Sequence, residues 1–443
     1  MIVERERQVV SQRGILVAGL VLTALYVAGL MWLAGLGSYN FFIACLIAPV
    51  LVAISLPALA REARREGDRT LFWILVGALL VKLVASLVRY YIDFVYYHGV
   101  ADAAGYYGKG LALSEQFRAG VFHLNLHTFT GSSTFTYLIS AAVLTIIGPS
   151  KLGGFLVFSW LGFWGLFFFY RAFVIAVPEG RRRQYAALTF FMPTLLFWPS
   201  EIGKEAWMML SLGLAAYGAA VALARSPWRG LLASALGLWL ASLVRPHMAA
   251  MLVLAMAVGF LVRKPKSELR QLAPVVKGLG LALVGILAFV LVRKASAFLA
   301  QAGVTVGGGL THAVDQLVAR TGGGGSGFEP SILTSPIHAP IDIVTVLYRP
   351  LLFEANSITS LAAALEGSFL LVLTVVRFRW IIAAARSVRR QPYVAVALAY
   401  TIMFLIAFSV FANYGTLVRE RSQLLPLFFV LLCVPPPKLR SEE

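Results

Sequence analysis

Apolar residues in this chain occur in long continuous blocks, and short polar segments separate the blocks. A helix of about 20 apolar residues crosses the hydrocarbon core of a bilayer, and many blocks approach or exceed that length. The longer blocks are residues 14–36, 41–60, 71–97, 152–177, 206–224, 273–293, 363–385 and 393–412, and the shorter ones are 134–148, 186–199, 231–244, 248–262 and 423–436. The pattern predicts an all-α fold: a polytopic transmembrane helical bundle of about 11–13 spans, in one integral membrane domain covering residues 1–443.

Two polar stretches are longer than a simple turn. Residues 98–133 and 294–362 are predicted to be outward loops, each with a segment that lies in the membrane interface. The second stretch contains "VGGGL" and "TGGGGSGFEP", and glycine at this density indicates a mobile loop. The block 134–148 is short and ends at Gly148-Pro149, so we interpret it as a re-entrant or interfacial segment.

Charge is sparse, and its placement predicts the topology. Charged residues make up 13% of the chain, about half the share usual in a soluble domain, and the net formal charge is +18. Basic residues cluster in short loops, which is typical of the cytoplasmic side. The clusters are Arg61, Arg64, Arg65 and Arg69; Arg181, Arg182 and Arg183; Arg263, Lys264, Lys266 and Arg270; and Arg386, Arg389 and Arg390. We therefore expect a multi-pass protein with a cytoplasmic N-terminus, and no nucleic-acid partner.

The polar segments that this topology places on the outer side all carry ionisable residues. These are Arg89, Asp93, Asp102 and Lys109; Glu201, Lys204 and Glu205; Arg245 and His247; Arg349 and Glu354; and Arg419, Glu420 and Arg421. Burying a charge near a bilayer is costly, so ionisable residues at span ends tend to be paired or functional. Each group alone is equally consistent with a solvated anchor. Because every outward turn carries one, we expect the loops to enclose a single ion-rich pocket.

The two charge types suggest different roles in that pocket. The general base is expected among His247 and the outward acids, and we choose Asp102, Glu201 and His247 as the candidates. The outward acids are Asp93, Asp102, Glu201, Glu205, Glu354 and Glu420. His247 alone is equally consistent with a simple turn residue. The cations suit a phosphate or diphosphate, which arginine binds with a forked set of donors. The predicted substrate-binding residues are Lys204, Glu205, Arg245, Arg349, Arg419 and Arg421, with Glu205 paired locally to Lys204.

Aromatic residues crowd the first outward loop, and the usual metal and nucleotide motifs are missing. The aromatic residues either anchor the protein at the interface or form a platform on which a sugar stacks. They are Tyr90, Tyr91, Phe94, Tyr96, Tyr97, Tyr106 and Tyr107. No HExxH, Cys/His cluster or GxxxxGK[ST] motif occurs, so no metal and no cofactor are predicted. Cys45 and Cys433 lie inside apolar blocks and predict no disulfide.

Several motifs occur in an order that resembles a known group of proteins. They are "DAAGYY", "GPSKLGGFLVFSWLGFWGLFFFYRAF", "FMPTLLFWPSEIGKEAWMMLSLGLAAYG", "LVRPHMAAM", "YRPLLFEANSITSLAAALEG" and "NYGTLVRERSQLLPLFFV". From about residue 85 to 436 the chain resembles bacterial multi-span proteins of exopolysaccharide and cell-envelope glycan synthesis. It is similar to O-antigen and capsule polymerases and, more distantly, to GT-C-type membrane glycosyltransferases. It departs from the GT-C pattern in that Asp102 follows the third predicted span, not the first.

The resemblance implies an undecaprenyl-type diphosphate sugar donor. It assigns donor binding to Asp102, Glu201, Lys204, Glu205, Arg245, His247, Arg419 and Arg421. Residues and resemblance together predict a membrane glycosyltransferase or polysaccharide polymerase on the outer face of a bacterial plasma membrane. Its expected partners are a polyprenyl-phosphate-linked glycan, membrane lipid and other proteins of envelope glycan synthesis. Two alternatives remain: a transporter or flippase of a lipid-linked glycan, and a non-catalytic scaffold of an envelope synthesis complex.

Overall fold

The computed structural model describes residues 23–122, 133–263 and 339–436, with scattered positions at 17–21 and 278–328. Throughout these residues the chain is helical, and the only pairing of the β type in them is an isolated bridge between Gly327 and Asn413. The predicted all-α class is therefore confirmed. Most of the predicted block 273–293, most of the glycine-rich stretch of 294–362 and the basic loop after Arg263 lie outside the described residues.

Among the residues that the structure describes, five helices are long and apolar enough to cross a membrane. They are α2 (Tyr39–Glu66), α3 (Arg69–Tyr91) with its π-helical continuation η1 (Ile92–Tyr96), α6 (Lys151–Ala176), α9 (Lys204–Ala224) and α15 (Ile358–Val376). Four shorter apolar helices accompany them in the described part: Thr23–Gly35, α5 (Thr134–Ile147), α11 (Pro246–Val262) and α17 (Pro392–Phe408). The chain thus has the helices of a membrane protein, while the predicted count of about 11–13 spans stays a prediction.

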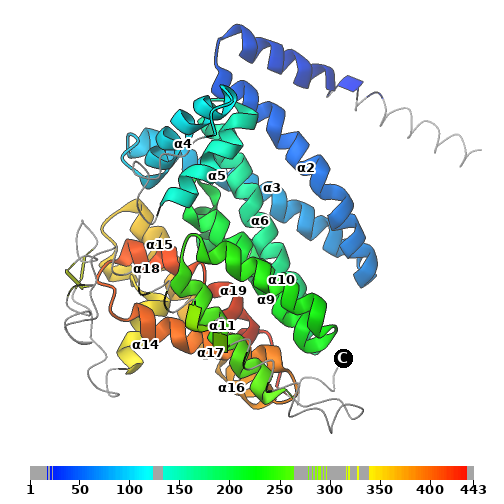
Figure 1. Ribbon diagram of the computed structural model, residues 1–443, viewed down its shortest axis with the longest axis vertical. Coiled ribbons are helices and arrows are strands. Elements are labelled where there is room, and N and C mark those ends of the chain that lie inside the picture. The colour runs from blue at the N-terminus through cyan, green and yellow to red at the C-terminus, as the bar shows by residue number, and fades with distance from the viewer. Residues whose placement is uncertain are drawn as a thin grey trace, which may run out of the picture.

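The remaining described elements are shorter helices between and around these spans. They are α4 (Asp102–Arg118), α7 (Arg182–Phe191), α8 (Pro193–Phe197), η2 (Trp198–Ser200), α10 (Pro227–Ser242), α14 (Ala339–Tyr348), η6 (Leu352–Glu354), α16 (Phe378–Ser387), α18 (Tyr414–Arg421) and α19 (Leu425–Leu432). In Figure 1, α2 lies along one edge of the bundle, while α6 and α9 run through its middle.

The centre of the bundle is the pair α6 and α9. Within their most apolar windows 72% of the residues are buried, against 22% in α2 and α15, so the latter two face outward. Glycines make the close approach of the pair possible. A Cβ on Gly165 would collide with the main chain of Met209, and a Cβ on Gly213 would collide with the carbonyl of Gly165. Small residues that let two backbones meet are typical of helix packing in membranes.

The predicted span 186–199 is broken, which corrects the sequence-based expectation of one continuous helix. Pro193 ends α7, and the chain continues through α8 and η2. Side chains from two other helices bind the backbone groups at the break. Lys82 of α3 donates from Nζ to the carbonyls of Leu195 and Leu196 at 2.7 and 3.0 Å, and Glu366 of α15 accepts from the amide of Thr194 at 2.7 Å.

The predicted span 363–385 is also divided. Helix α15 ends at Val376, and α16 begins at Phe378, with Arg377 between them in a non-helical conformation. The Arg377 guanidinium donates to the carbonyl of Leu432 at 2.9 Å and lies over the ring of Trp380 at 4.6 Å. These contacts tie the turn to the end of α19, which explains why the helix stops there.

Helices α4 and α5 form a hairpin-like pair beside the end of α6 (Figure 1). A Cβ on Gly110 of α4 would lie 2.6 Å from the Cβ of Ser140 of α5, so the two helices touch closely. Arg118 caps the end of α5 by donating to the carbonyls of Leu144 and Thr145 at 2.5 and 3.1 Å. The block 134–148 is therefore one short helix packed on α4, and its predicted interfacial position stays a prediction.

Candidate functional site

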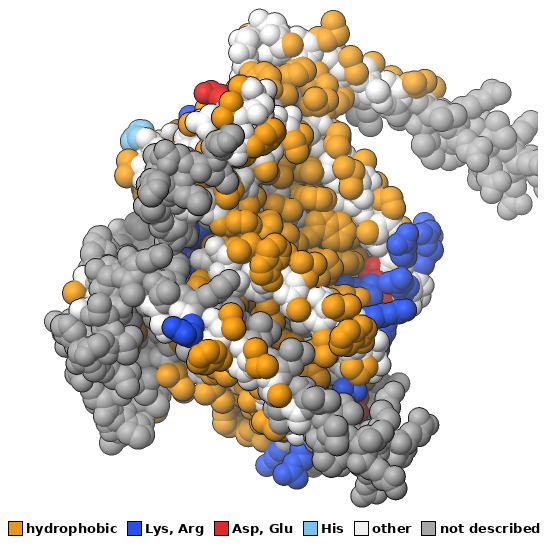
Figure 2. All heavy atoms as spheres, in the orientation of Figure 1, with side chains coloured by type: hydrophobic (Ala, Val, Ile, Leu, Met, Phe, Trp, Pro, Cys, Tyr) orange, Lys and Arg blue, Asp and Glu red, His pale blue; other side chains and the backbone are white. Residues whose placement is uncertain are grey.

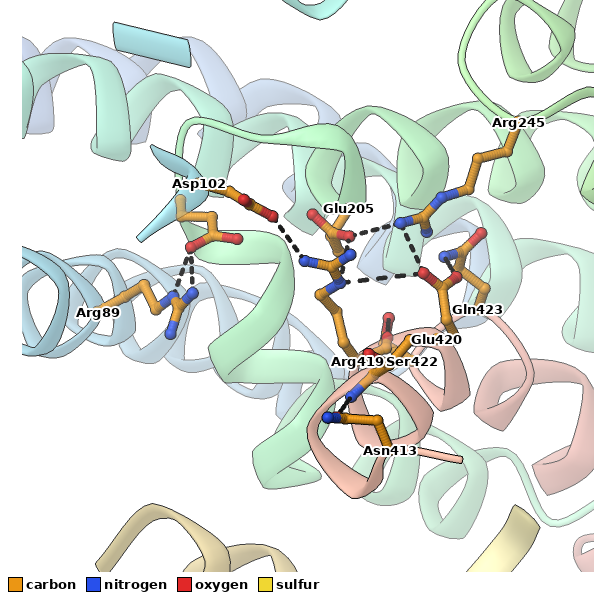
Figure 3. Close-up of polar contacts among 11 residues, drawn as sticks. Arg89, Asp102, Glu205, Arg245, Asn413, Arg419, Glu420, Ser422 and Gln423 are labelled. Carbon is orange, nitrogen blue, oxygen red and sulfur yellow. Dashed lines mark hydrogen bonds and ion pairs between the residues drawn. The ribbon is translucent and has the colours of Figure 1, made fainter. Parts of the chain in front are cut away.

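Four helix ends bring arginines and carboxylates together in one network (Figure 3). Glu205 lies in the first turn of α9, Arg245 caps α11, Arg419 and Glu420 end α18, and Asp102 begins α4. The central guanidinium, that of Arg245, contacts Glu205 at 2.8 Å and Glu420 at 2.7 Å through Nη2. Arg419 contacts Glu205 at 3.2 Å through Nε and Asp102 at 2.9 Å through Nη1. We call these five residues the ion network.

Local sequence signals position Arg245, helix α18 and the two glutamates around Gly203. Pro246 at the first position of α11 fixes the helix start, so Arg245 stands just before it. The Asn413 side chain accepts from the amide of Thr416 at 3.0 Å and so sets the start of α18. Gly203 is fully extended, and a Cβ there would lie 3.3 Å from both the Glu201 and Glu205 side chains. The glycine therefore leaves room for one carboxylate on each side of it, those of Glu201 and Glu205.

The ion network is buried at one end and open at the other. Glu205, Arg245 and Glu420 are 2%, 5% and 5% exposed, whereas the side chains of Arg419 and Asp102 are 27% and 60% exposed. Burial raises the pKa of Glu420, and the two arginines oppose that shift. The Glu205 carboxylate raises the pKa of Arg419, which keeps that guanidinium a cation. Any reactant would therefore reach the network from the side of Asp102 and Arg419.

A second cluster, which shares no ion pair with the first, joins Arg89 to two carboxylates. Nε of Arg89 donates to the Glu201 carboxylate at 2.7 Å, and Nη1 of Arg89 lies 3.3 Å from the Asp93 carboxylate. The rings of Phe197 and Trp198 lie against the guanidinium at 4.5 and 4.8 Å. Arg89, Asp93 and Glu201 are all buried, and burial raises the pKa of Glu201 to about 8. One cation therefore faces two acids, and burial favours the protonated form of Glu201.

Two cationic side chains retain unused donors: Lys204 beside the ion network and Arg245 within it. Lys204, half-buried at the start of α9, has no hydrogen bond or ion pair within the described ranges. The Nη1 atom of Arg245 is buried and has no hydrogen-bond partner there. The predicted local pair of Glu205 with Lys204 is wrong, since Glu205 is held by Arg245 and Arg419. Neighbouring positions on a helix do not face each other, which accounts for the error.

His247 lies in the first turn of α11, half-buried, near Arg245 and Lys204. Seven of the predicted site residues thus gather at one end of α9: Asp102, Glu201, Lys204, Glu205, Arg245, His247 and Arg419. The selection from the sequence left out Arg89, Asp93 and Glu420, although all three belong to the outward polar groups. The sequence signal that could have identified Glu420 is its position between Arg419 and Arg421.

Arg349 and Arg421 lie apart from the ion network and have other partners. Arg421 is 1% exposed and donates to the main-chain carbonyls of Val346 and Arg349. Arg349 pairs with Glu354, and the ring of Tyr414 lies 4.9 Å from its guanidinium. These contacts fasten α18 to the segment after α14, and they leave the predicted role in substrate binding without support from the geometry.

The aromatic residues of the first outward loop differ in burial, and Tyr90 and Phe94 are half-buried. Tyr106 and Tyr107 are each 9% exposed and pack in a small core with Phe155 and Phe158, so their faces are not open to a sugar. Tyr91, Tyr96 and Tyr97 are exposed. For the exposed set, anchoring at the interface and sugar stacking both remain open.

The described residues contain no group of three or more His, Cys, Asp or Glu side chains that could hold a metal ion. Fold and site together define a helical membrane-type protein with a buried network of arginines and carboxylates at one end of its central helix pair. Comparison of the chain with protein-family models, with curated proteins and with solved structures found no match.

Proposed function

We propose that this chain is a membrane glycosyltransferase or polysaccharide polymerase that uses a polyprenyl-phosphate- or diphosphate-linked sugar donor on the extracytoplasmic face. The observation that carries the proposal is the ion network, in which the exposed carboxylate of Asp102 lies next to the half-buried Arg419, with the buried Arg245 behind it. Lys204 lies beside this network and has no hydrogen bond or ion pair in the described part. The resemblance to O-antigen and capsule polymerases, and more distantly to GT-C enzymes, supports the same reading.

The donor phosphate would bind to the unused donors. Lys204 Nζ, Arg245 Nη1 and the exposed part of Arg419 lie at the same end of α9. When the bond between the anomeric carbon and the phosphate oxygen breaks, negative charge grows on the leaving phosphate. Fixed cations at that point stabilise the transition state, and they do so most strongly where water is excluded. Arg349 and Arg421 are not assigned to this step, because Arg349 is paired with Glu354 and Arg421 donates to main-chain carbonyls.

Asp102 is the general base of this proposal. Its side chain is 60% exposed, whereas Glu201 is buried against Arg89, so an acceptor hydroxyl can reach Asp102 first. The hydroxyl oxygen forms the new bond to the anomeric carbon, its proton passes to Asp102, and the phosphate leaves with the electron pair. Arg419 donates to the same carboxylate and so orients it.

The rival function of a transporter rests on ionisable residues deep in the spans. Lys82 and Glu366 are such residues, but Glu366 binds an amide at the start of α8 and Lys82 binds two carbonyls near its end, before η2. Non-helical backbone at membrane depth needs such partners, so these two residues are explained without a transport path. The contacts therefore favour chemistry at one end of the bundle.

The test uses the purified full-length chain in sealed vesicles that contain a fluorescent polyprenyl-diphosphate-linked oligosaccharide. The proposal expects longer glycans on a gel, and a released polyprenyl diphosphate in matching amount. Movement of unchanged glycan between leaflets, with no elongation, would support the flippase instead. If the protein alone neither elongates nor moves the glycan, but restores polymer formation when added to its partner proteins, it is the scaffold.

A further inference from the structure

The end of α9 that is remote from the ion network borders a polar cavity of about 460 Å³. The ends of α2, α6 and α9 form it, and its charged and aromatic lining consists of Glu62, Arg65, Glu66, Arg171, Tyr217 and Arg225. Helix α9 has 21 residues, so at about 1.5 Å per residue this cavity lies roughly 30 Å from Glu205. We call it the arginine cavity, and it is independent of the proposed transfer site.

Positive charge in the arginine cavity exceeds what its own carboxylates neutralise. Glu62 is bound by Arg171 and lies 3.9 Å from Arg65, and Glu66 is bound by Arg182. The guanidinium of Arg225 is exposed and has no partner among the residues that the structure describes, and the side chain of Arg65 is 57% exposed. In addition, Nε of Arg171 is buried without an acceptor. An anion is the ligand that such a cavity would accept.

A line of aromatic side chains leads from the middle of the bundle to this cavity. Trp160, Trp164 and Phe168 of α6 are spaced four residues apart, so they share one face of the helix with Arg171. The rings of Trp160 and Trp164 are 6.2 Å apart, the ring of Phe168 is 5.7 Å from that of Tyr217, and Arg171 lies 5.8 Å from Tyr217. We call these four rings the aromatic ladder.

The ladder is only partly covered by protein. All four rings are half-buried, although 72% of the residues in the apolar windows of α6 and α9 are buried. Figure 2 shows apolar side chains over the middle of the face, and Lys and Arg side chains gathered at one end of it, near the ends of α2 and α10. An apolar surface at membrane depth that ends in a cationic cavity matches a lipid. The acyl chain would contact the apolar surface, and the anionic headgroup would contact the cavity.

We propose that the arginine cavity and the aromatic ladder together bind one anionic phospholipid. The phosphate lies between Arg65, Arg171 and Arg225, and an acyl chain lies along Trp160, Trp164 and Phe168. Basic pockets between helices on the cytoplasmic side are known to take anionic headgroups, and the clustered arginines assign this end of the bundle to that side.

The experiment titrates the delipidated full-length protein with phosphatidylglycerol or phosphatidylcholine and counts retained lipids by native mass spectrometry. Wild type should retain one phosphatidylglycerol in clear preference to phosphatidylcholine. Arg65→Gln with Arg225→Gln should weaken that binding on the order of tenfold or more, since each arginine near a headgroup contributes about 1 kcal/mol. The matched control is Arg389→Gln with Arg390→Gln, two exposed arginines from another basic loop at the same end, and it should bind like wild type.

Equal loss in both double variants would overturn the site, because the preference would then reflect net charge alone. Inorganic phosphate added in large excess should not displace the lipid, and full displacement would show an anion site without a lipid. A second measurement uses phosphatidylglycerol with a brominated acyl chain, which quenches nearby tryptophan fluorescence. Quenching should fall in Trp160→Phe with Trp164→Phe, and unchanged quenching would contradict the acyl position.

Discussion

The guanidinium of Arg419 lies 2.9 Å from the carboxylate of Asp102, although 317 positions separate the two residues along the chain. This pair joins the start of α4 to the end of α18 and forms the exposed side of the ion network. Behind it the carboxylates and Arg245 are buried, so the contact is the point at which the network meets its surroundings. Variants at this exposed side change chemistry with little risk to folding.

Asp102→Asn is the most direct test of the proposed base. An amide keeps the shape of the side chain but cannot take a proton, so glycan elongation should fall by about 10²–10⁴-fold with the protein still folded. Glu115→Gln on the same helix removes an exposed carboxylate outside the network and should elongate like wild type. Comparable activity in both variants would exclude Asp102 as the base.

Lys204→Gln tests binding of the leaving phosphate. Because Lys204 has no ion pair in the described part of the structure, its replacement should leave the unfolding temperature nearly unchanged. Elongation should drop by about 10²-fold or more, mostly in kcat, since a cation at the leaving group acts chiefly in the transition state. Lys109→Gln, an exposed lysine of α4, is the control. A loss of stability without a loss of rate would contradict the assigned role.

Arg245→Met should destabilise the protein in addition to weakening phosphate binding. The change leaves Glu205 and Glu420 buried without their shared partner, which costs about 3–5 kcal/mol for a buried pair. Thermal unfolding in detergent would measure it, with Arg229→Met, an exposed arginine of α10, as a control expected within about 0.5 kcal/mol of wild type. Unchanged stability in Arg245→Met would mean that the network is not structural.

Glu201→Gln tests the protonation of the Arg89 cluster. Glu201 has a pKa of about 8 in the folded chain, above the ordinary value of a carboxyl group. An acid with a raised folded pKa stabilises the fold below its unfolded pKa, and this contribution is lost as the pH rises through the folded value. Wild type should therefore unfold at lower temperature as the pH goes from about 5 to 9, and Glu201→Gln should lose that slope. A slope that persists in the variant would place the proton elsewhere.

Gly165→Leu should prevent assembly of the central helix pair. A side chain there meets the main chain of Met209, which cannot move away without separating α6 from α9. Gly77→Leu in α3 is the matched control, since a Cβ at that glycine meets nothing within 4 Å. Folded yield from detergent extracts should fall to near zero for the first variant and stay near wild type for the second. Equal yields would show that the pair is not closely packed.

Hydropathy was enough to locate most of the long helices. The predicted block 152–177 corresponds to α6, and the block 206–224 corresponds to α9. The breaks after Phe191 and Val376 were not predicted, because each is stabilised by contacts with residues that are distant in the sequence. Lys82 and Glu366 supply partners for the freed backbone groups, and nothing in the local sequence announces them.

Topology also indicated that outward loops would meet, but it could not assign partners. Arg419 and Arg421 are two residues apart, and two residues on a helix point to nearly opposite faces. One therefore enters the ion network while the other binds the main chain of the segment after α14. Burial separates two acids that the sequence presents as equivalent: Asp102 is exposed, whereas Glu201 is buried and its pKa is raised.

The contact between Glu366 and the amide of Thr194 links residues that are synthesised 172 positions apart. During translation the segment around Pro193 must enter the bilayer long before its carboxylate partner exists. We expect this segment to stay bound to the translocon or to an insertase, and to reach its final conformation only after α15 has been inserted. The native conformation of the Pro193 segment is thus expected to form only after α15 has been synthesised.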